Sequence, residues 1–290
     1  MLTQSPVPFG RYELVHRLEQ GPEGAVHLAR LTGAAGFEKL YVLKTLALQP
    51  GGDSGPAERF QHEARLLVNL RHSNIAQVYE LGEVDGTYFM AMEYVPGVDL
   101  SRVLGRARQL GAAVPIPMAL YVGQQVAEAL GYAHRKKVEG QPLEVVHRAV
   151  APRNVMVSFE GEVKVLDFGQ ARSVAAAALT LPSAVVGRLG YMSPEQARAE
   201  KADARSDIYS AGVVLWEMLA GRRLYEDMTQ GELLAAMAHP AVPPLRSIRP
   251  DVSPFLEAVV HRALAPAAGE RYARAEELAR ALNEARLHEG

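Results

Sequence analysis

Residues 147–169 read HRAVAPRNVMVSFEGEVKVLDFG, and the rest of the chain is organised around this stretch. It starts with a histidine and an arginine, reaches Asn154 in a short loop, and ends on Asp167, Phe168 and Gly169. Position 149, inside the loop, is an alanine. Because a methyl group neither donates nor accepts a proton, Ala149 can take no part in acid or base chemistry.

The order and spacing of these residues resemble the catalytic loop and metal-binding turn of eukaryotic-type Ser/Thr protein kinases, including the bacterial Hanks-type enzymes. The resemblance implies that Asn154 and Asp167 hold Mg²⁺ and that Arg148 belongs to the catalytic loop. The chain departs from the family twice. Ala149 replaces the aspartate that accepts the proton of the substrate hydroxyl, and Ala151 replaces the lysine beside the γ-phosphate. The catalytic loop is therefore expected to be degenerate.

A second motif of the same family lies near the N-terminus. Gly21, Gly24 and Val26 match the last three fixed positions of the glycine-rich loop, whereas Glu19 replaces its first glycine. Glycine lets backbone N–H groups approach phosphate oxygens, and a carboxylate at that position would repel them unless it turns outward. ATP binding is therefore expected to be weakened or blocked if Glu19 faces the phosphates.

The phosphate clamp of the family has its counterpart in Lys44, which ends a stretch similar to the Val-Ala-Ile-Lys motif. Glu63 follows on an expected helix whose apolar face carries Phe60, Ala64, Leu67 and Val68. The resemblance implies that Lys44 holds the α- and β-phosphates and that Glu63 holds Lys44 through an ion pair.

Five further residues complete the nucleotide site that the resemblance implies. Val42 is expected above the adenine ring, Met92 at the back of the pocket, and Glu93 and Val95 in the hinge, where backbone groups recognise adenine. Met156 is also expected in this site.

The second half of the chain carries the remaining motifs. Glu195, in Ser-Pro-Glu, resembles the glutamate of the Ala-Pro-Glu motif, with Arg271 as its buried partner, and Asp207 resembles the aspartate that braces the catalytic loop. Between the motifs lies the activation segment, where Thr180 and Ser183 are candidate phosphorylation sites. Arg188 stands there in place of the threonine that normally touches the catalytic aspartate.

The predicted fold is α+β and two-lobed, a protein-kinase-like domain over residues 9–290. A small antiparallel lobe covers about residues 9–95, and a larger, mainly helical lobe covers about residues 96–290. Strands are expected at 12–18, 25–30, 40–46, 78–81 and 87–92, with a turn at Asp85 and Gly86. Helices are expected after Pro117, at 207–220, and around Leu278 and Leu282.

Composition excludes several classes of function. The net charge is −2 with mixed signs along the chain, so neither nucleic acid nor a membrane surface is an expected partner. The chain contains no cysteine, which excludes disulfides and thiolate metal sites. No apolar run reaches the length of a membrane span, and residues 1–10 lack the pattern of a signal peptide. A soluble, cytoplasmic protein is expected.

The leading hypothesis is a pseudokinase, a domain that retains the residues for ATP and Mg²⁺ and regulates or scaffolds a protein partner, such as an active kinase or its substrate. One alternative is a weakly active or unconventional Ser/Thr kinase that transfers the γ-phosphate to protein hydroxyls. Another is an engineered inactive form of an active kinase. The engineered form is ranked lower, because a single inactivating substitution would explain Ala149 but not Ala151 or Arg188.

Overall fold

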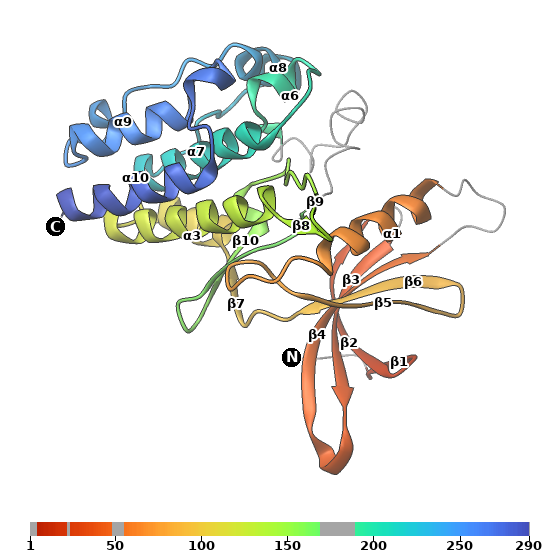
Figure 1. The fold of residues 1–290 in the computed structure, drawn as a ribbon. Helices are drawn as coiled ribbons and strands as arrows, with labels where there is room; N and C mark the ends of the chain where they lie inside the picture. Colours follow the sequence, from red (N-terminus) through yellow and green to blue (C-terminus); the bar gives the residue numbers. More distant parts are fainter. Residues whose placement is uncertain (1–4, 22–23, 48–54, 169–188, 290) are drawn as a thin grey trace. The chain divides into compact units, whose positions relative to one another are not determined.

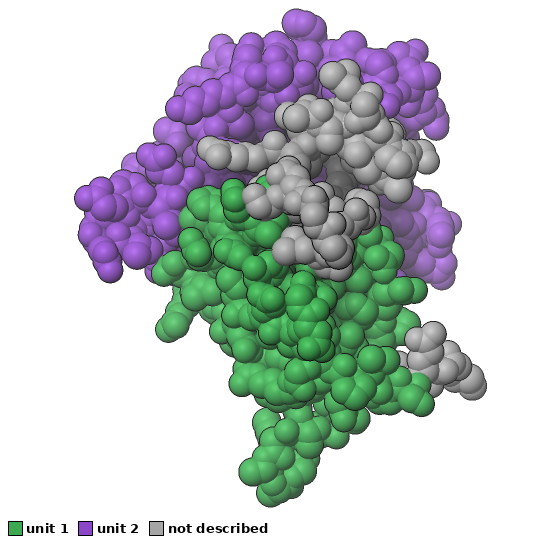
Figure 2. Space-filling model, turned by 90° about the vertical axis from the view of Figure 1, so that its right-hand side faces the viewer, with its two compact units in different colours: residues 1–96 green, residues 97–290 purple. Residues whose placement is uncertain are grey.

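The computed structural model describes residues 5–21, 24–47, 55–168 and 189–289. The chain divides into two compact units, Met1–Pro96 and Gly97–Gly290 (Figure 2). The first unit is built on an antiparallel sheet with helix α1, and the second is mainly helical (Figure 1). The structure confirms the predicted α+β class and the kinase-like architecture of a sheet lobe and a helical lobe.

The sheet of the first unit has the strand order β1-β2-β3-β4-β6-β5, and neighbouring strands are antiparallel. Its strands are β1 (Val7–Phe9), β2 (Tyr12–Gln20), β3 (Gly24–Thr32), β4 (Glu38–Ala47), β5 (Val78–Val84) and β6 (Thr87–Glu93), and a short 3-10 turn, η1 (Ala34–Gly36), joins β3 to β4. The strands β2 to β5 extend beyond the predicted ranges, because pairing with neighbours recruits polar residues that the sequence pattern does not assign to a strand.

The predicted turn between β5 and β6 is confirmed. Asp85 and Gly86 have φ values of 48° and 75° and connect Val84 directly to its partner Thr87. Two consecutive residues with positive φ form the turn whose twist matches that of antiparallel strands, and Asp-Gly is a favoured pair for it.

Helix α1 (Gly55–Leu67) confirms the expected helix but ends before Val68. Phe60, Ala64 and Leu67 are buried along one face, as predicted. Val68 was predicted on that face; it lies beyond the helix and is 37% exposed. The 3.6-residue pattern continues past the last turn of the helix, which is why periodicity alone placed Val68 wrongly.

The second unit contains helices α2 (Leu100–Gln109), α3 (Ile116–His134), α6 (Pro194–Ala197), α7 (Ala204–Ala220), α8 (Gln230–Ala238), α9 (Pro254–Ala263) and α10 (Ala275–His288), with 3-10 turns η2 (Pro152–Asn154), η4 (Leu245–Ser247) and η5 (Ala268–Glu270). Its short strands are β7 (Gly97–Asp99), β8 (Lys137–Val138), β9 (Gln141–Pro142), β10 (Val155–Ser158) and β11 (Val163–Val165). Helix α3 packs against α7 and α10, which forms the core. No helix in the described part of the chain is long and apolar enough to cross a lipid bilayer.

Helix α7 starts three residues earlier than predicted and is buried on all sides. Asp203 caps its first turn by accepting a hydrogen bond from the backbone of Arg205, and Gly221 ends it with a φ of 70°. Every residue from Ser206 to Leu219 is buried, not only the predicted inward face. A helix that is buried all round is typical of the centre of a helical domain. Its N-terminal turn therefore provides a fixed platform for polar residues.

Candidate functional site

The sheet brings several expected nucleotide-binding residues to one face. On β4, Lys44 lies opposite Val26 of β3, and Val42 lies opposite Leu28 of β3 and Met92 of β6. Directly paired residues point to the same side of a sheet, and so do residues two apart on one strand. Val26, Val42, Lys44 and Met92 therefore share one face, which we call the Lys44 face.

The side chain of Glu93 lies on the opposite face. Glu93 pairs with Tyr41, which alternates with Val42 along β4. Its carboxylate accepts a hydrogen bond from the backbone N–H of Gln77 at 3.1 Å, and its own N–H donates to the Gln77 carbonyl at 2.8 Å. Val95 is buried, with 6% of its surface exposed. The expectation that the backbone of Glu93 and Val95 recognises adenine stays a prediction.

The two glycines of the glycine-rich loop have different structural roles. The N–H of Gly21 donates to the Gly24 carbonyl at 2.8 Å and closes the turn between β2 and β3. A Cβ atom on Gly24 would lie 1.8 Å from the carbonyl oxygen of Thr45 on β4. Close contact between two backbones admits only glycine at position 24, so this residue is required by the fold whatever the loop binds.

The predicted ion pair between β4 and α1 is confirmed. Lys44 Nζ lies 2.9 Å from Glu63 Oε1, and the two side chains are only 19% and 13% exposed. Partial burial strengthens such a pair relative to a surface pair, because water screens the charges less. Lys44 is therefore held in a defined position on its face of the sheet.

Glu19 lies on the Lys44 face because of a bulge in β2. The pairing of β2 with β3 shifts register between Arg17 and Glu19, which leaves Glu19 opposite Val26. Regular pairing onward from Arg17 would have put Leu18 opposite Val26 and turned Glu19 to the other face. Glu19 is exposed there. The carboxylate is therefore on the side where the sequence analysis expects phosphate groups.

In the second unit, Asp207 braces the loop that starts at His147, as predicted. Asp207 is fully buried, and its carboxylate accepts hydrogen bonds from the backbone N–H groups of His147 at 2.8 Å and Arg148 at 2.6 Å. Its Oδ2 also lies 2.8 Å from Nε2 of His134 on α3. No motif in the sequence points to this role of His134. Helices α7 and α3 together fix the start of the loop.

His147 is a neutral, structural residue of the loop. Burial lowers the pKa of the imidazole, which keeps it uncharged. Nε2 donates to the carbonyl of Leu166 at 2.8 Å, and Nδ1 accepts from the N–H of Ala149 at 3.2 Å. The ring also packs on Phe168, with centroids 4.5 Å apart. One side chain thus connects the loop to the strand end that carries Asp167.

The loop keeps its shape although it lacks the proton acceptor. Asn154 Nδ2 donates to the carbonyl of Ala149 at 2.8 Å, and the N–H of Asn154 donates to the carbonyl of Ala151 at 2.9 Å. Ala151 is 4% exposed. The two alanines therefore occupy a hydrogen-bonded loop in which their own side chains offer no polar atom.

The two expected metal ligands are held close in the fold. The carbonyl of Asn154 accepts a hydrogen bond from the N–H of Leu166 at 2.8 Å. Asp167 is the residue that follows Leu166, so this bond holds its backbone near Asn154. Since Nδ2 of Asn154 is engaged, its Oδ1 is the side-chain atom left to coordinate a cation. Asp167 has a φ of 57° and Arg148 a φ of 63°. Such left-handed conformations in residues other than glycine are strained and are common at functional sites.

These residues fit Mg²⁺ with incomplete protein coordination. Among the described residues, no three His, Asp or Glu side chains gather as a metal site, and the chain has no cysteine. Mg²⁺ typically binds one or two protein oxygens together with phosphate oxygens and water. Asn154 and Asp167 supply the oxygen atoms that such a mode requires. Met156, on β10, is half-buried opposite Lys164 and Asp99.

The predicted pair of Glu195 and Arg271 is confirmed as a buried, bidentate ion pair. Both bonds are 2.8 Å long, and the side chain of Arg271 is fully buried. Ser206 also donates to Glu195 at 2.6 Å. Burial alone would raise the pKa of Glu195, but the hydrogen bonds from Arg271 and Ser206 outweigh it and lower the pKa to about 2.

Gln196 is a positioning residue that is absent from the predicted site residues. Its Nε2 donates to the carbonyl of Arg148 at 3.0 Å, and Ser193 forms a reciprocal cap with it at the start of α6. The Ser-x-x-Gln spacing was a visible signal for that cap. Helix α6 therefore ties the Glu195–Arg271 pair to the catalytic-type loop.

Four residues singled out in the sequence lie outside the described residues. They are Gly169, Thr180, Ser183 and Arg188. Their expected roles remain predictions.

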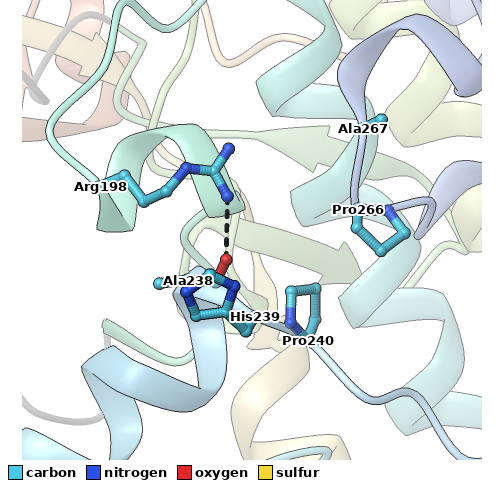
Figure 3. Close-up of a pocket in the computed structure, with 6 residues that line it drawn as sticks. All are labelled: Arg198, Ala238, His239, Pro240, Pro266 and Ala267. Atoms are coloured by element: carbon cyan, nitrogen blue, oxygen red, sulfur yellow. Dashed lines mark hydrogen bonds between the residues drawn. The ribbon is translucent and has the colours of Figure 1, made fainter.

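A cavity of about 470 Å³ opens in the second unit (Figure 3). It is lined by Arg198, Ala238, His239, Pro240, Pro266 and Ala267. Arg198 donates to the carbonyl of Ala238 at 2.9 Å and to Glu200 at 2.9 Å and 3.2 Å. Because these bonds engage the guanidinium, the cavity presents no free charge that would define a ligand.

Comparison with known proteins shows the family to which this fold belongs. The protein kinase domain family matches residues 12–279. The chain belongs to this family. The kinase domain is 40% identical over 276 residues to the tyrosine-protein kinase MasK of Myxococcus xanthus and 30% identical over 269 residues to the serine/threonine-protein kinase PrkC of Bacillus subtilis. These alignments cover 95% and 93% of the kinase domain, and 43% and 39% of the two relatives.

A crystal structure of the PknI kinase domain from Mycobacterium tuberculosis is similar over 97% of this kinase domain and 99% of that chain, with a TM-score of 0.70 and 30% identity. These relatives are bacterial protein kinases, which supports the prediction that the chain is a Hanks-type kinase domain. Protein kinases use ATP and Mg²⁺, in agreement with the cofactors expected from the motifs. The kinase domain spans about two fifths of the length of the curated relatives.

Proposed function

We propose that this kinase domain is a pseudokinase. The observation that carries the proposal is Ala149, whose side chain offers no proton acceptor at that position although Asp207, His147 and Asn154 hold the loop in a fixed conformation. A general base contributes roughly 10² to 10⁴ in rate, or about 3 to 5 kcal/mol of barrier. Phosphoryl transfer to a protein hydroxyl is therefore expected to be absent or very slow.

Nucleotide binding is the property that the retained residues support. Lys44, fixed by Glu63, would contact the α- and β-phosphates, and Asn154 and Asp167 would hold Mg²⁺. Val26, Val42 and Met92 would provide the apolar surface for adenine on the Lys44 face. When bound, ATP would supply the negative charge that orders these groups. The domain then acts by binding a protein partner, either an active kinase or its substrate, and we place this activity in the cytoplasm.

A slow Ser/Thr kinase is the second candidate. It is favoured by the two retained metal ligands and by relatives whose names describe kinases. Phosphoryl transfer depends largely on positioning and on metal ions, so loss of the base need not abolish turnover. Mass spectrometry of the domain after incubation with ATP and Mg²⁺ separates the candidates, since stoichiometric phosphoryl transfer within minutes contradicts the pseudokinase.

Thermal unfolding in the presence of ATP and Mg²⁺ tests nucleotide binding. A ligand at about one hundred times its Kd adds about 2.7 kcal/mol to the free energy of unfolding, which raises Tm by several degrees. Lys44→Ala is expected to abolish most of this shift. Lys39→Ala is the matched control, because Lys39 is an exposed lysine of the same strand and alternates away from Lys44. Equal ATP-dependent Tm shifts in both variants would show that Lys44 does not contact the nucleotide.

Glu19→Gln is expected to strengthen nucleotide binding. The substitution removes a negative charge from the Lys44 face while keeping the size of the side chain, and two charges about 4 Å apart in water repel by about 1 kcal/mol. The Kd for ATP measured by titration calorimetry should fall by about fivefold, and by less for adenosine, which carries no phosphate. Glu83→Gln, at an exposed position of β5, makes the same charge change elsewhere in the unit. An unchanged Kd in Glu19→Gln would show that this carboxylate does not face the phosphates.

A further inference from the structure

An exposed phenylalanine lies at the tip of the turn between β10 and β11. Phe159 is 79% exposed, the largest exposed fraction among the large apolar side chains that the structure describes. It makes no ring contact with another described residue. The first central position of such a turn normally carries proline or a small polar residue, so the fold does not require an aromatic ring there.

The turn that carries Phe159 is rigid. Ser158, 7% exposed, accepts hydrogen bonds at its hydroxyl from the N–H groups of Glu160 at 3.3 Å and Glu162 at 2.9 Å. Its backbone N–H donates to the Glu162 carbonyl at 2.8 Å, and its carbonyl accepts from Gly161 at 3.1 Å. A side chain on a fixed backbone loses little conformational entropy on binding, which favours its use as an interface anchor.

Helix α3 extends the apolar surface beside this turn. The hydroxyl of Tyr121 donates to the carbonyl of Gly161 at 3.1 Å, which joins the helix to the turn. Met118 precedes Tyr121 by three positions and so lies on the same face of the helix. Tyr121 is 40% and Met118 52% exposed. The two side chains and Phe159 form an apolar surface on two elements joined by a hydrogen bond.

The charge around this surface is acidic. Glu160 and Glu162 flank the tip of the turn, and both are exposed. Neither lysine nor arginine occurs in residues 109–134 or 154–163, which include the N-terminal half of α3 and the whole turn. Neither glutamate has an ion-pair partner among the described residues. We call Met118, Tyr121, Phe159, Glu160 and Glu162 the Phe159 patch.

We propose that the Phe159 patch binds a basic segment of a protein partner that places an apolar side chain against Phe159. The two exposed glutamates beside the ring disfavour nucleic acid and anionic lipid as ligands, because both carry negative charge. A positively charged peptide with an apolar side chain complements both the carboxylates and the ring. The inference extends the proposed function, in which the domain acts through a protein partner, but it does not depend on nucleotide binding.

The test uses fluorescence anisotropy with a short fluorescein-labelled amphipathic peptide of lysine and leucine. Its counterpart, in which glutamate replaces every lysine, is the charge control. The intact domain should bind the lysine peptide, with an affinity that falls as salt rises, and should not bind the glutamate peptide. Phe159→Ser should weaken binding by about tenfold or more, as expected for an anchor residue. Phe37→Ser, at another exposed phenylalanine, should leave the Kd unchanged.

A double variant tests the charges separately. Glu160→Lys with Glu162→Lys should weaken binding by about tenfold at low salt and remove most of its salt dependence. Glu83→Lys with Glu284→Lys alters the net charge equally at exposed sites elsewhere and should have little effect. Unchanged Tm values would show that the variants are folded. Equal binding by the Phe159 and Phe37 variants, or by the two double variants, would overturn the proposal. A nucleotide-induced Tm shift, measured independently, would leave the proposed function standing in that case.

Discussion

Replacing Ala149 by aspartate is expected to raise the rate of phosphoryl transfer to a generic protein substrate by about 10² to 10⁴. The backbone of residue 149 is already fixed by the bonds to His147 and Asn154, so a carboxylate there starts from an ordered loop. It restores the proton acceptor for the substrate hydroxyl. Incorporation of labelled phosphate, measured for both proteins at saturating ATP and Mg²⁺, gives the rate ratio.

Ala149→Asn is the matched control, because asparagine has the size of aspartate but accepts a proton poorly. It should remain as slow as the parent. Adding Ala151→Lys to Ala149→Asp should increase the rate again, since it returns positive charge to the transferring group. If Ala149→Asp shows no gain while its ATP-dependent Tm shift is intact, the missing base is not what limits the domain. Full activity from Ala149→Asp alone would favour the engineered inactive kinase among the alternatives.

Arg271→Ala is expected to destabilise the second unit by about 3 to 5 kcal/mol, because it leaves the buried carboxylate of Glu195 without its cation. Urea unfolding followed by circular dichroism measures this loss. Arg205→Ala is a suitable comparison, since Arg205 pairs with Asp203 at the surface, where both side chains are more than a third exposed. Removal of a surface pair costs about 0 to 1 kcal/mol. Similar losses in the two variants would contradict the assignment of Glu195 and Arg271 as a structural pair.

The pair of Glu195 and Arg271 also predicts that the stability of the domain depends on pH. The pKa of Glu195 is lowered from 4.5 to about 2 in the folded state. A depressed carboxyl pKa contributes stability that is fully present above the unfolded-state pKa and is lost as pH falls through the folded value. Acid unfolding of the parent should therefore include a component between about pH 5 and pH 2. Arg271→Ala should lack this component, because its unpaired carboxyl would already be neutral near pH 5.

The motifs were predictable from the sequence because each is a short stretch of residues with fixed spacing. Lys44 and Glu63 were identified as a pair from two such stretches, and so were Glu195 and Arg271, although the second pair lies 76 positions apart. The Asp85–Gly86 turn followed from local backbone preference. Family membership adds to each of these assignments, because the motifs occur in family order across residues 12–279.

The orientation of side chains next to a register shift or between distant elements was not predictable. The bulge in β2 puts Glu19 opposite Val26, and a register different by one residue would have turned it to the other face. Gln196 was missed because its bond to Arg148 depends on where α6 meets the catalytic-type loop. The buried surroundings of α7 likewise come from several helices, so a periodicity that marks one face could not reveal them.

By itself, the sequence determined that the chain is a kinase domain and that position 149 offers no proton acceptor, because side-chain chemistry and motif spacing are written in residue order. Only the tertiary structure decided that Glu19 shares the face of Lys44, that Gln196 helps to hold the altered loop in shape, and that Phe159 is displayed on an exposed acidic turn. These properties depend on strand register and on contacts between distant elements, which form only when the chain has packed.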